Sequence, residues 1–121
     1  MTGSSAVPPR VLVVEDEYLI RMLLEDMLDE LGYGVVAAVG TISEARQIAT
    51  DGEFSAAILD VNLDGQEIYP VADILAKRGL PFVFVTGYGE RSLPEAYRGR
   101  PALQKPFQSE QLRSTLAGLL A

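Results

Sequence analysis

The sequence predicts an α/β fold in which a single, doubly wound sheet of five parallel strands is covered by helices on both faces. Two observations support this class. Short unbroken apolar runs alternate with segments whose apolar residues recur at helical spacing, and the length of 121 residues suits one domain. Strands buried on both faces of a parallel sheet are apolar throughout, and right-handed crossovers through the helices keep such strands in one sheet.

The chain starts its pattern with a strand and a long helix. Residues 11–14 are four adjacent apolar residues, which predicts a buried strand. In the next segment apolar residues recur every fourth position, beside a second apolar row, which predicts an amphipathic helix. The two rows are Leu19, Leu23, Met27 and Leu31, and Ile20, Leu24 and Leu28. Gly32 follows, and it suits the left-handed position that ends many helices.

Two further strands flank a shorter helix. Residues 35–39 and 56–59 are apolar runs, and Asp60 ends the second of them. Between them, Thr41 precedes Glu44 by three residues, which is the capping-box spacing of a helix start. The buried side of this helix is expected to hold Ile42, Ala45, Ile48 and Ala49.

The second half of the chain predicts a third helix, two strands and a closing helix. The third helix should begin between Gln66 and Pro70, after the Asp64-Gly65 turn signal, because proline is tolerated only in a first helical turn. Residues 81–85 form a fourth strand, and residues 101–104 a shorter fifth one. The apolar residues of the two helices are Val71, Ile74 and Leu75, and Leu112, Leu116, Leu119 and Leu120.

The remaining segments have weaker patterns. Residues 87–100 hold three glycines and a proline, and their possible core anchors are Leu93, Ala96 and Tyr97, so we expect any helix there to be short or mobile. Residues 1–9 are predicted to be a disordered arm or an added segment, and residues 10–121 the folded domain. The chain lacks a membrane-spanning apolar run and the regions of a signal peptide, so we expect a soluble, cytoplasmic protein.

The composition excludes several kinds of chemistry. The sequence has no cysteine and no histidine, which rules out thiolate metal sites, disulfides, imidazole bases and phosphohistidine. The net charge of −7 argues against nucleic acid as the main partner. Residues 1–75 carry fourteen acids and three bases, whereas residues 76–121 carry three acids and seven bases. The acidic charge is therefore concentrated in the first part of the chain.

Polar residues stand at the carboxyl ends of four predicted strands, where open α/β sheets bind ligands. These residues are Glu15 and Asp16, Asp60, Thr86 and Lys105. Clustered carboxylates raise one another's pKa unless a cation offsets the repulsion, and Mg²⁺ prefers oxygen ligands. Carboxylates, Mg²⁺, a lysine and a hydroxyl are what phosphoryl transfer requires, and Asp60, at the end of a rigid strand, is the candidate nucleophile.

Each residue taken alone also has a structural explanation. Glu15 and Asp16 suit the start of a helix, Asp60 suits a turn, and Thr86 and Lys105 suit a strand end and a solvent-exposed position. Their occurrence together at four strand ends favours a functional site.

With these motifs, the sequence resembles the receiver domain of bacterial two-component response regulators over residues 10–120. The matching motifs are Glu15-Asp16-Glu17, the strand end Ile-Leu-Asp60-Val-Asn62, Thr86-Gly87 and Lys105-Pro106-Phe107. The resemblance implies a flavodoxin-like receiver fold. It also implies a signalling domain, and not an enzyme, that promotes only its own phosphorylation and dephosphorylation.

The resemblance also assigns roles within the site. Asp60 would accept a phosphoryl group from a histidine kinase, while Thr86 and Lys105 would contact phosphoryl oxygens. The output would be a protein contact, either regulation of a kinase or transfer of the phosphoryl group to a histidine phosphotransfer protein. Mg²⁺ would bind Asp16, Asp60 and the backbone carbonyl of Asn62, and Glu15 would act through a metal-bound water. The bond before Pro106 is expected to be cis, and the protein a monomer or weak dimer.

Three features depart from the common receiver pattern. Ala102 occupies the position of the usual aromatic switch residue, and Leu63-Asp64-Gly65 replaces the usual Met-Pro pair. Phe84-Val85-Thr86-Gly87 is similar to the Phe-Ala-Thr-Gly motif of the stand-alone FAT GUY receivers, in which the fourth helix is short or mobile. We therefore expect residues 87–100 to report the phosphorylated state to a partner.

Three alternatives remain from other classes. A pseudo-receiver would keep the fold without being phosphorylated, which the complete set of site residues disfavours. A haloacid dehalogenase-type phosphatase would require a second aspartate where Asn62 stands. A flavodoxin is disfavoured because Glu15-Asp16-Glu17 would repel the flavin phosphate.

Overall fold

The structure is a computed structural model that describes residues 8–63, 65–87 and 93–121. Residues 1–7 of the predicted arm and residues 88–92 of the weakly patterned segment lie outside the described residues. Pro9, which the sequence placed in the arm, contributes to the fold because its carbonyl accepts a 2.9 Å hydrogen bond from the Gly34 N–H.

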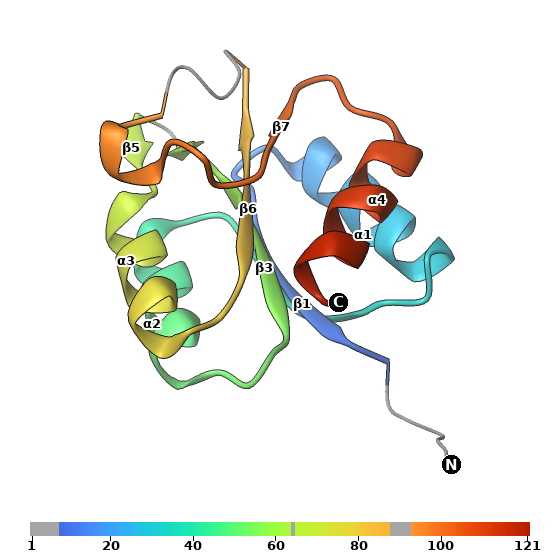
Figure 1. Ribbon diagram of the computed structural model, residues 1–121, viewed down its shortest axis with the longest axis horizontal. Coiled ribbons are helices and arrows are strands. Elements are labelled where there is room, and N and C mark those ends of the chain that lie inside the picture. Colours follow the sequence, from blue (N-terminus) through green and yellow to red (C-terminus); the bar gives the residue numbers. More distant parts are fainter. Residues whose placement is uncertain (1–7, 64, 88–92) are drawn as a thin grey trace.

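Five parallel strands form the predicted sheet, in the order β2-β1-β3-β6-β7. Helices α1 and α4 cover one face, and α2 and α3 cover the other (Figure 1). The strands are β1 (Arg10–Val14), β2 (Gly34–Val39), β3 (Ala56–Asp60), β6 (Phe82–Thr86) and β7 (Ala102–Gln104). The helices are α1 (Tyr18–Glu30), α2 (Ile42–Asp51), α3 (Tyr69–Arg78) and α4 (Ser109–Leu119). The predicted doubly wound α/β fold is confirmed.

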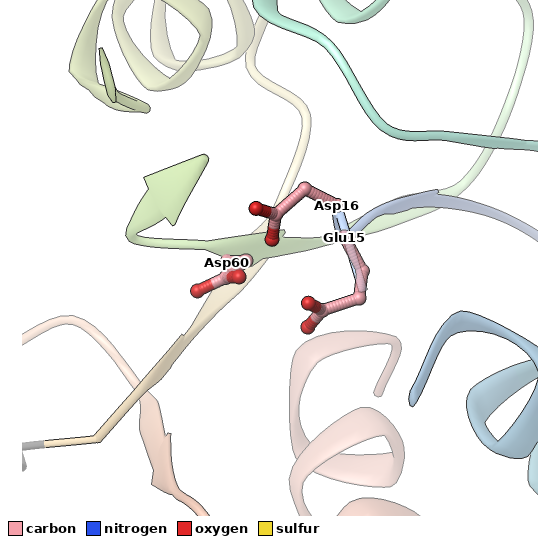
Figure 2. A group of neighbouring side chains, drawn as sticks. All are labelled: Glu15, Asp16 and Asp60. Atoms are coloured by element: carbon pink, nitrogen blue, oxygen red, sulfur yellow. The ribbon is translucent and has the colours of Figure 1, made fainter. Parts of the chain in front are cut away.

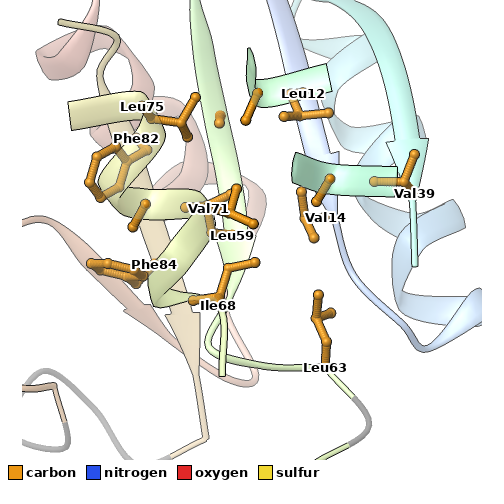
Figure 3. Packing of buried hydrophobic residues seen from close by; sticks show 14 of the residues in the cluster. Leu12, Val14, Val39, Leu59, Leu63, Ile68, Val71, Leu75, Phe82 and Phe84 are labelled. Carbon is orange, nitrogen blue, oxygen red and sulfur yellow. The ribbon is translucent and has the colours of Figure 1, made fainter. Parts of the chain in front are cut away.

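The apolar runs of the strands fill both layers between sheet and helices. Leu12 and Val14 of β1 pack under α2 and α3, as Figure 3 shows, whereas Val11 and Val13 pack under α1 and α4. All four side chains are fully buried. Because successive residues of a strand point to opposite faces, a strand covered on both sides must be apolar at every position.

The helix ends use the predicted capping residues. The hydroxyl of Thr41 accepts a 3.2 Å hydrogen bond from the Glu44 N–H at the start of α2. Gly32 has a φ of +88° after α1, and the Tyr33 N–H donates to the Leu28 carbonyl, as in a Schellman motif. Gly79 ends α3 in the same region of backbone conformation, with a φ of +73°.

A short hairpin precedes α3 that the sequence pattern did not predict. Strands β4 (Asn62–Leu63) and β5 (Gln66–Glu67) pair antiparallel around the predicted turn, in which Gly65 has a φ of +85°. Strands of two residues leave no periodic apolar pattern. The hairpin follows directly from the end of β3 and therefore forms part of the rim around Asp60.

The described part of residues 87–100 contains a 3-10 turn, η2 (Glu95–Tyr97). Leu93 and Tyr97 are buried in the core under α2 and α3, whereas Ala96 is exposed, so the expectation that Ala96 is an anchor was wrong. Exposed apolar residues also occur on α1, where Leu19 and Leu23 are 78% and 51% accessible. The apolar stripe of α1 is wider than the surface that the sheet covers. None of the described helices is both long and apolar enough to cross a membrane.

Candidate functional site

Three carboxylates meet at the carboxyl edge of the sheet. Glu15 and Asp16 follow β1, and Asp60 ends the neighbouring β3. Figure 2 shows the three side chains gathered at this edge, and one oxygen from each lies within 4.8 Å of the others. Glu15 and Asp60 are buried, with 1% and 5% accessibility. The sequence therefore predicted correctly that these residues come together.

Lys105 supplies the positive charge of the cluster. Its Nζ lies 3.2 Å from Oε1 of Glu15 and 3.4 Å from Oδ2 of Asp60, with Glu17 further away at 3.8 Å. Lys105 directly follows β7, whose register with β6 places it at the same edge. The bond between Lys105 and Pro106 is cis, as the resemblance implied.

Burial and charge shift the acid–base equilibria of the cluster. Burial raises the pKa of Glu15 to about 7, and the charge of Asp60 adds to this shift. Burial also raises the pKa of Asp60, although Lys105 acts in the opposite direction. Burial would lower the pKa of Lys105, but the carboxylates of Asp60 and Glu15 outweigh it and raise the pKa. The pKa values of Glu15 and Asp60 are thus raised even with Lys105 beside them, which favours binding of a further cation at these two carboxylates.

Backbone amides orient two of the carboxylates. The Glu17 N–H donates to Oε2 of Glu15 at 3.1 Å, and the Asn62 N–H donates to Oδ1 of Asp60 at 3.3 Å. The side-chain oxygen of Asn62 accepts a 2.8 Å hydrogen bond from the Gly65 N–H. Asp60 lies at a cavity of about 370 Å³, whose other lining residues are Asp16, Glu17, Asn62, Gly65, Gly87 and Lys105.

The donor set suits a hard divalent cation. Carboxylate oxygens from Glu15, Asp16 and Asp60 are the ligands that Mg²⁺ prefers, and an open cavity leaves room for the waters that it retains. The family resemblance assigned the backbone carbonyl of Asn62 as a further ligand, and Asn62 lines the same cavity.

A second cavity, of about 540 Å³, extends from Asp60 past the end of β6. Thr86, with 2% accessibility, and Gly87 line it on the β6 side. Glu67 and Tyr69 line it as well, and neither was among the predicted site residues. The available signal was the position of Tyr69, which directly precedes Pro70 at the start of the helix that follows Asp60.

This fold and this site define a family. The family described as the response regulator receiver domain matches residues 11–117. The chain therefore belongs to the response regulator receiver domain family.

Individual relatives carry the same domain. The chain is 39% identical to the transcriptional regulatory protein PdtaR of Mycobacterium tuberculosis over 93% of its own length and 59% of PdtaR. It spans about half the length of the curated relatives it matches. The solution structure of the BeF3-activated conformation of SdrG from Pseudomonas melonis Fr1 is 47% identical, with a TM-score of 0.81, covering 98% of this chain and 100% of SdrG.

A third relative is the receiver domain of the sensor histidine kinase PA1611 from Pseudomonas aeruginosa, solved with a magnesium ion coordinated in its active site cleft. It is 25% identical, with a TM-score of 0.81, and the match covers 93% of this chain and 98% of that domain.

Proposed function

We propose that this receiver domain accepts a phosphoryl group on Asp60 from a histidine kinase and signals by protein contact, with a kinase or a histidine phosphotransfer protein as the partner. One observation carries the proposal. The buried carboxylate of Asp60 ends β3 and lies 3.4 Å from the ammonium of Lys105, within a group of three carboxylates that suits Mg²⁺. The proposal includes a stand-alone role and a cytoplasmic location.

The residues of the site divide the work of phosphoryl transfer. An oxygen of Asp60 attacks the phosphorus, the bond from phosphorus to the donor's imidazole nitrogen breaks, and its electron pair stays on that nitrogen. Lys105 and the Thr86 hydroxyl stabilise the charge on the phosphoryl oxygens. Asp16, Asp60 and the Asn62 carbonyl would hold Mg²⁺, with Glu15 acting through a bound water. The ion would neutralise negative charge at the phosphoryl group.

Two relatives support this chemistry. SdrG adopts an activated conformation with BeF3, and the PA1611 receiver coordinates magnesium in its active site cleft. Both observations belong to those proteins. They support the proposal because the cluster here contains the oxygen ligands and the lysine that such binding requires.

Membership of the FAT GUY subfamily is part of the proposal. Phe84 and Thr86 lie on β6 with Gly87 directly after it, and Ala102 of β7 is the register partner of Phe84. The 3-10 turn η2 in the described residues before β7 suits a receiver with a short fourth helix.

The exposed apolar surface of α1 supports contact with a protein partner. Its residues Tyr18, Leu19, Met22 and Leu23 are 42% to 78% accessible. This surface starts directly after Glu17, whose carboxylate lies 3.8 Å from Lys105 of the site. The neighbouring carboxylates of Glu17 and Asp26 favour a partner with basic residues around an apolar contact.

Incubation with Mg²⁺ and a small phosphodonor, followed by intact mass measurement, tests the proposed function. We expect the wild type to gain the mass of one phosphoryl group and Asp60→Asn to gain none. No gain in the wild type would favour the pseudo-receiver.

A double variant tests the α1 surface. Leu19→Ser with Leu23→Ser should accept phosphate from the small donor as the wild type does, but much more slowly from a phosphorylated histidine kinase. Ala76→Ser, at an exposed position of α3, is the control. Equal transfer rates from the kinase would exclude α1 as the contact surface.

A further inference from the structure

A cluster of aromatic rings lies between the Asp60 cavity and the η2 turn. Tyr69 and Tyr97 stack with their centroids 5.6 Å apart and their planes at 14°. Phe84 meets Tyr69 and Tyr97 edge-on, at 6.0 and 5.4 Å. Because Phe84 lies on β6 two residues before Thr86, the stacked pair contacts the strand that carries the Thr86 hydroxyl.

Tyr69 connects this cluster to the cavity. It is the first residue of α3, and it lines the 540 Å³ cavity together with Asp60 and Thr86. A phosphoryl group on Asp60 would therefore occupy space that Tyr69 borders. A movement of Thr86 towards that group would also act on the ring through Phe84.

Tyr97 is held by a second contact to the same helix. Its hydroxyl donates a hydrogen bond to Oδ1 of Asp73, which lies one helical turn after Tyr69 on α3. Its side chain is buried, although η2 itself is exposed at Glu95 and Ala96. Helix α3 thus holds the η2 turn at two points, by a ring stack and by a hydrogen bond.

The aromatic switch residue of the common receiver pattern is replaced here by alanine. Ala102, the register partner of Phe84, packs against the same cluster and has no ring that could rotate. Tyr69 and Tyr97 supply rings in contact with β6 in its place.

We propose that Tyr69 is a positioning residue that couples the Asp60 site to the η2 turn, and that the hydrogen bond between Tyr97 and Asp73 latches this turn in the unphosphorylated state. This inference rests on the proposed function. Phosphorylation displaces the stacked pair, the latch opens, and the exposed surface around Glu95 and Arg98 is presented to a partner in a new position.

The latch has a thermodynamic consequence. A contact that is made only in the resting state reduces the population that is competent for activation. Removing the contact should therefore tighten the binding of a phosphoryl mimic by the same factor. For one hydrogen bond this factor is about two to ten.

Tyr97→Phe tests the latch because it removes the hydroxyl and keeps the ring. We expect it to bind beryllofluoride in the presence of Mg²⁺ about two to ten times more tightly than the wild type. Tyr33→Phe, on the opposite face of the sheet, is the matched control and should leave the affinity unchanged. Unchanged or weaker binding of beryllofluoride by Tyr97→Phe would overturn the latch. Loss of a merely structural contact would alter the stability of the protein without raising its affinity for the mimic.

Amide chemical shifts test the coupling through Tyr69. In the wild type, beryllofluoride should shift the amides of Asn62 and Lys105 and those of residues 93–100. In Tyr69→Leu the first group should still shift while residues 93–100 respond much less, and Tyr69→Phe should restore the response. An undiminished response in folded Tyr69→Leu would overturn the coupling.

The same experiments separate this inference from the proposed function. If neither group of amides responds in the wild type and no phosphoryl group is accepted, the proposed function fails and the inference fails with it. If Asn62 and Lys105 respond but residues 93–100 do not, the proposed function stands and the coupling is overturned. Should Tyr69→Leu fail to fold, the affinity of Tyr97→Phe decides the inference.

Discussion

The ammonium nitrogen of Lys105 lies 3.4 Å from Oδ2 of Asp60, although the two residues are 45 positions apart in the chain. It also lies 3.2 Å from Oε1 of Glu15. One cation directly after β7 therefore offsets two carboxylates, one that follows β1 and one that ends β3. The stability of this edge of the sheet and its affinity for other cations both depend on that one side chain.

Replacement of Lys105 by methionine should separate these two effects. Without Mg²⁺ the variant leaves two buried carboxylates without their counter-charge, and we expect the free energy of unfolding to fall by about 1 to 3 kcal/mol. Mg²⁺ should then bind more tightly, because the competing cation is gone. Urea unfolding with and without Mg²⁺ measures both quantities.

Lys77→Met is the matched control, since Lys77 is the other lysine of the sequence and is exposed on α3. Equal stability of the two variants would contradict a role for Lys105 in holding the carboxylate cluster together.

The sequence predicted this edge of the fold because its signals are local. A buried strand has to be apolar at every position, so the acids after residue 14 and at residue 60 and the lysine at residue 105 mark the strand ends. Parallel pairing then brings those ends together, whatever the distance between them along the chain.

Contacts between distant side chains were not predictable in this way. The stack of Tyr69 on Tyr97 depends on the packing of η2 against α3, which no periodic pattern encodes. In α1 the apolar stripe is wider than the covered surface, so spacing alone did not show that Leu19 is exposed while Leu24 is buried.

Asp16→Asn should weaken Mg²⁺ binding. Asp16, Glu15 and Asp60 each offer an oxygen within 4.8 Å of the others, and a neutral amide is a weaker ligand than a carboxylate. The melting temperature of the wild type should rise with Mg²⁺. The stabilisation should be about 2.7 kcal/mol at a concentration of one hundred times the dissociation constant. The rise should require a much higher concentration in Asp16→Asn. Asp26→Asn, an exposed carboxylate of α1, is the control, and an identical Mg²⁺ response in the Asp16 and Asp26 variants would exclude Asp16 as a ligand.

Asp60→Asn should fold and should be more stable than the wild type in the absence of Mg²⁺. The substitution removes one of three neighbouring carboxylates from a buried position and leaves Lys105 paired with Glu15. We expect a gain on the order of 1 kcal/mol in the free energy of unfolding, measured in urea with a chelator present. With added Mg²⁺ the wild type should become the more stable of the two proteins. It has the Asp60 carboxylate as a ligand and therefore binds the ion more tightly. A less stable variant in chelator would show that the repulsion is already compensated.

Two glycine substitutions should act in opposite directions. Gly79 has a φ of +73° at the end of α3, so Gly79→Ala should lower the free energy of unfolding by about 1 kcal/mol. Gly118 lies in α4 with no atom near the position of an added Cβ, so Gly118→Ala should raise it by about 0.5 to 1 kcal/mol. Denaturant midpoints measure both changes, and a shift of the same sign in both would contradict the assigned backbone conformations.

The stability of the protein at alkaline pH should depend on Tyr97. Burial raises the pKa of its phenol to about 12, and the hydrogen bond to Asp73 and the charge of that carboxylate add to the shift, whereas Arg100 opposes it. Burial also raises the pKa of the neighbouring Tyr69, and the negative charge of Glu67 adds to that shift.

The sign follows from the proton balance. An unfolded chain loses the Tyr97 proton near the ordinary pKa of 10.0, whereas the folded protein keeps it to about 12. The unfolded state therefore binds fewer protons between these values, and the contribution of this group to stability is complete below pH 10 and is lost as the pH rises towards 12.

Because the chain has five tyrosines and no tryptophan, tyrosinate absorbance reports these ionisations directly. In the folded wild type, checked by circular dichroism at each pH, the step at the highest pH should include Tyr97. Tyr97→Phe should lose the amplitude of one tyrosine from that step, and its stability should fall less steeply above pH 10. Tyr33→Phe should keep the highest step intact. A Tyr97→Phe protein that loses its amplitude near pH 10 instead would show that the phenol of Tyr97 is neither buried nor bonded to Asp73 in solution.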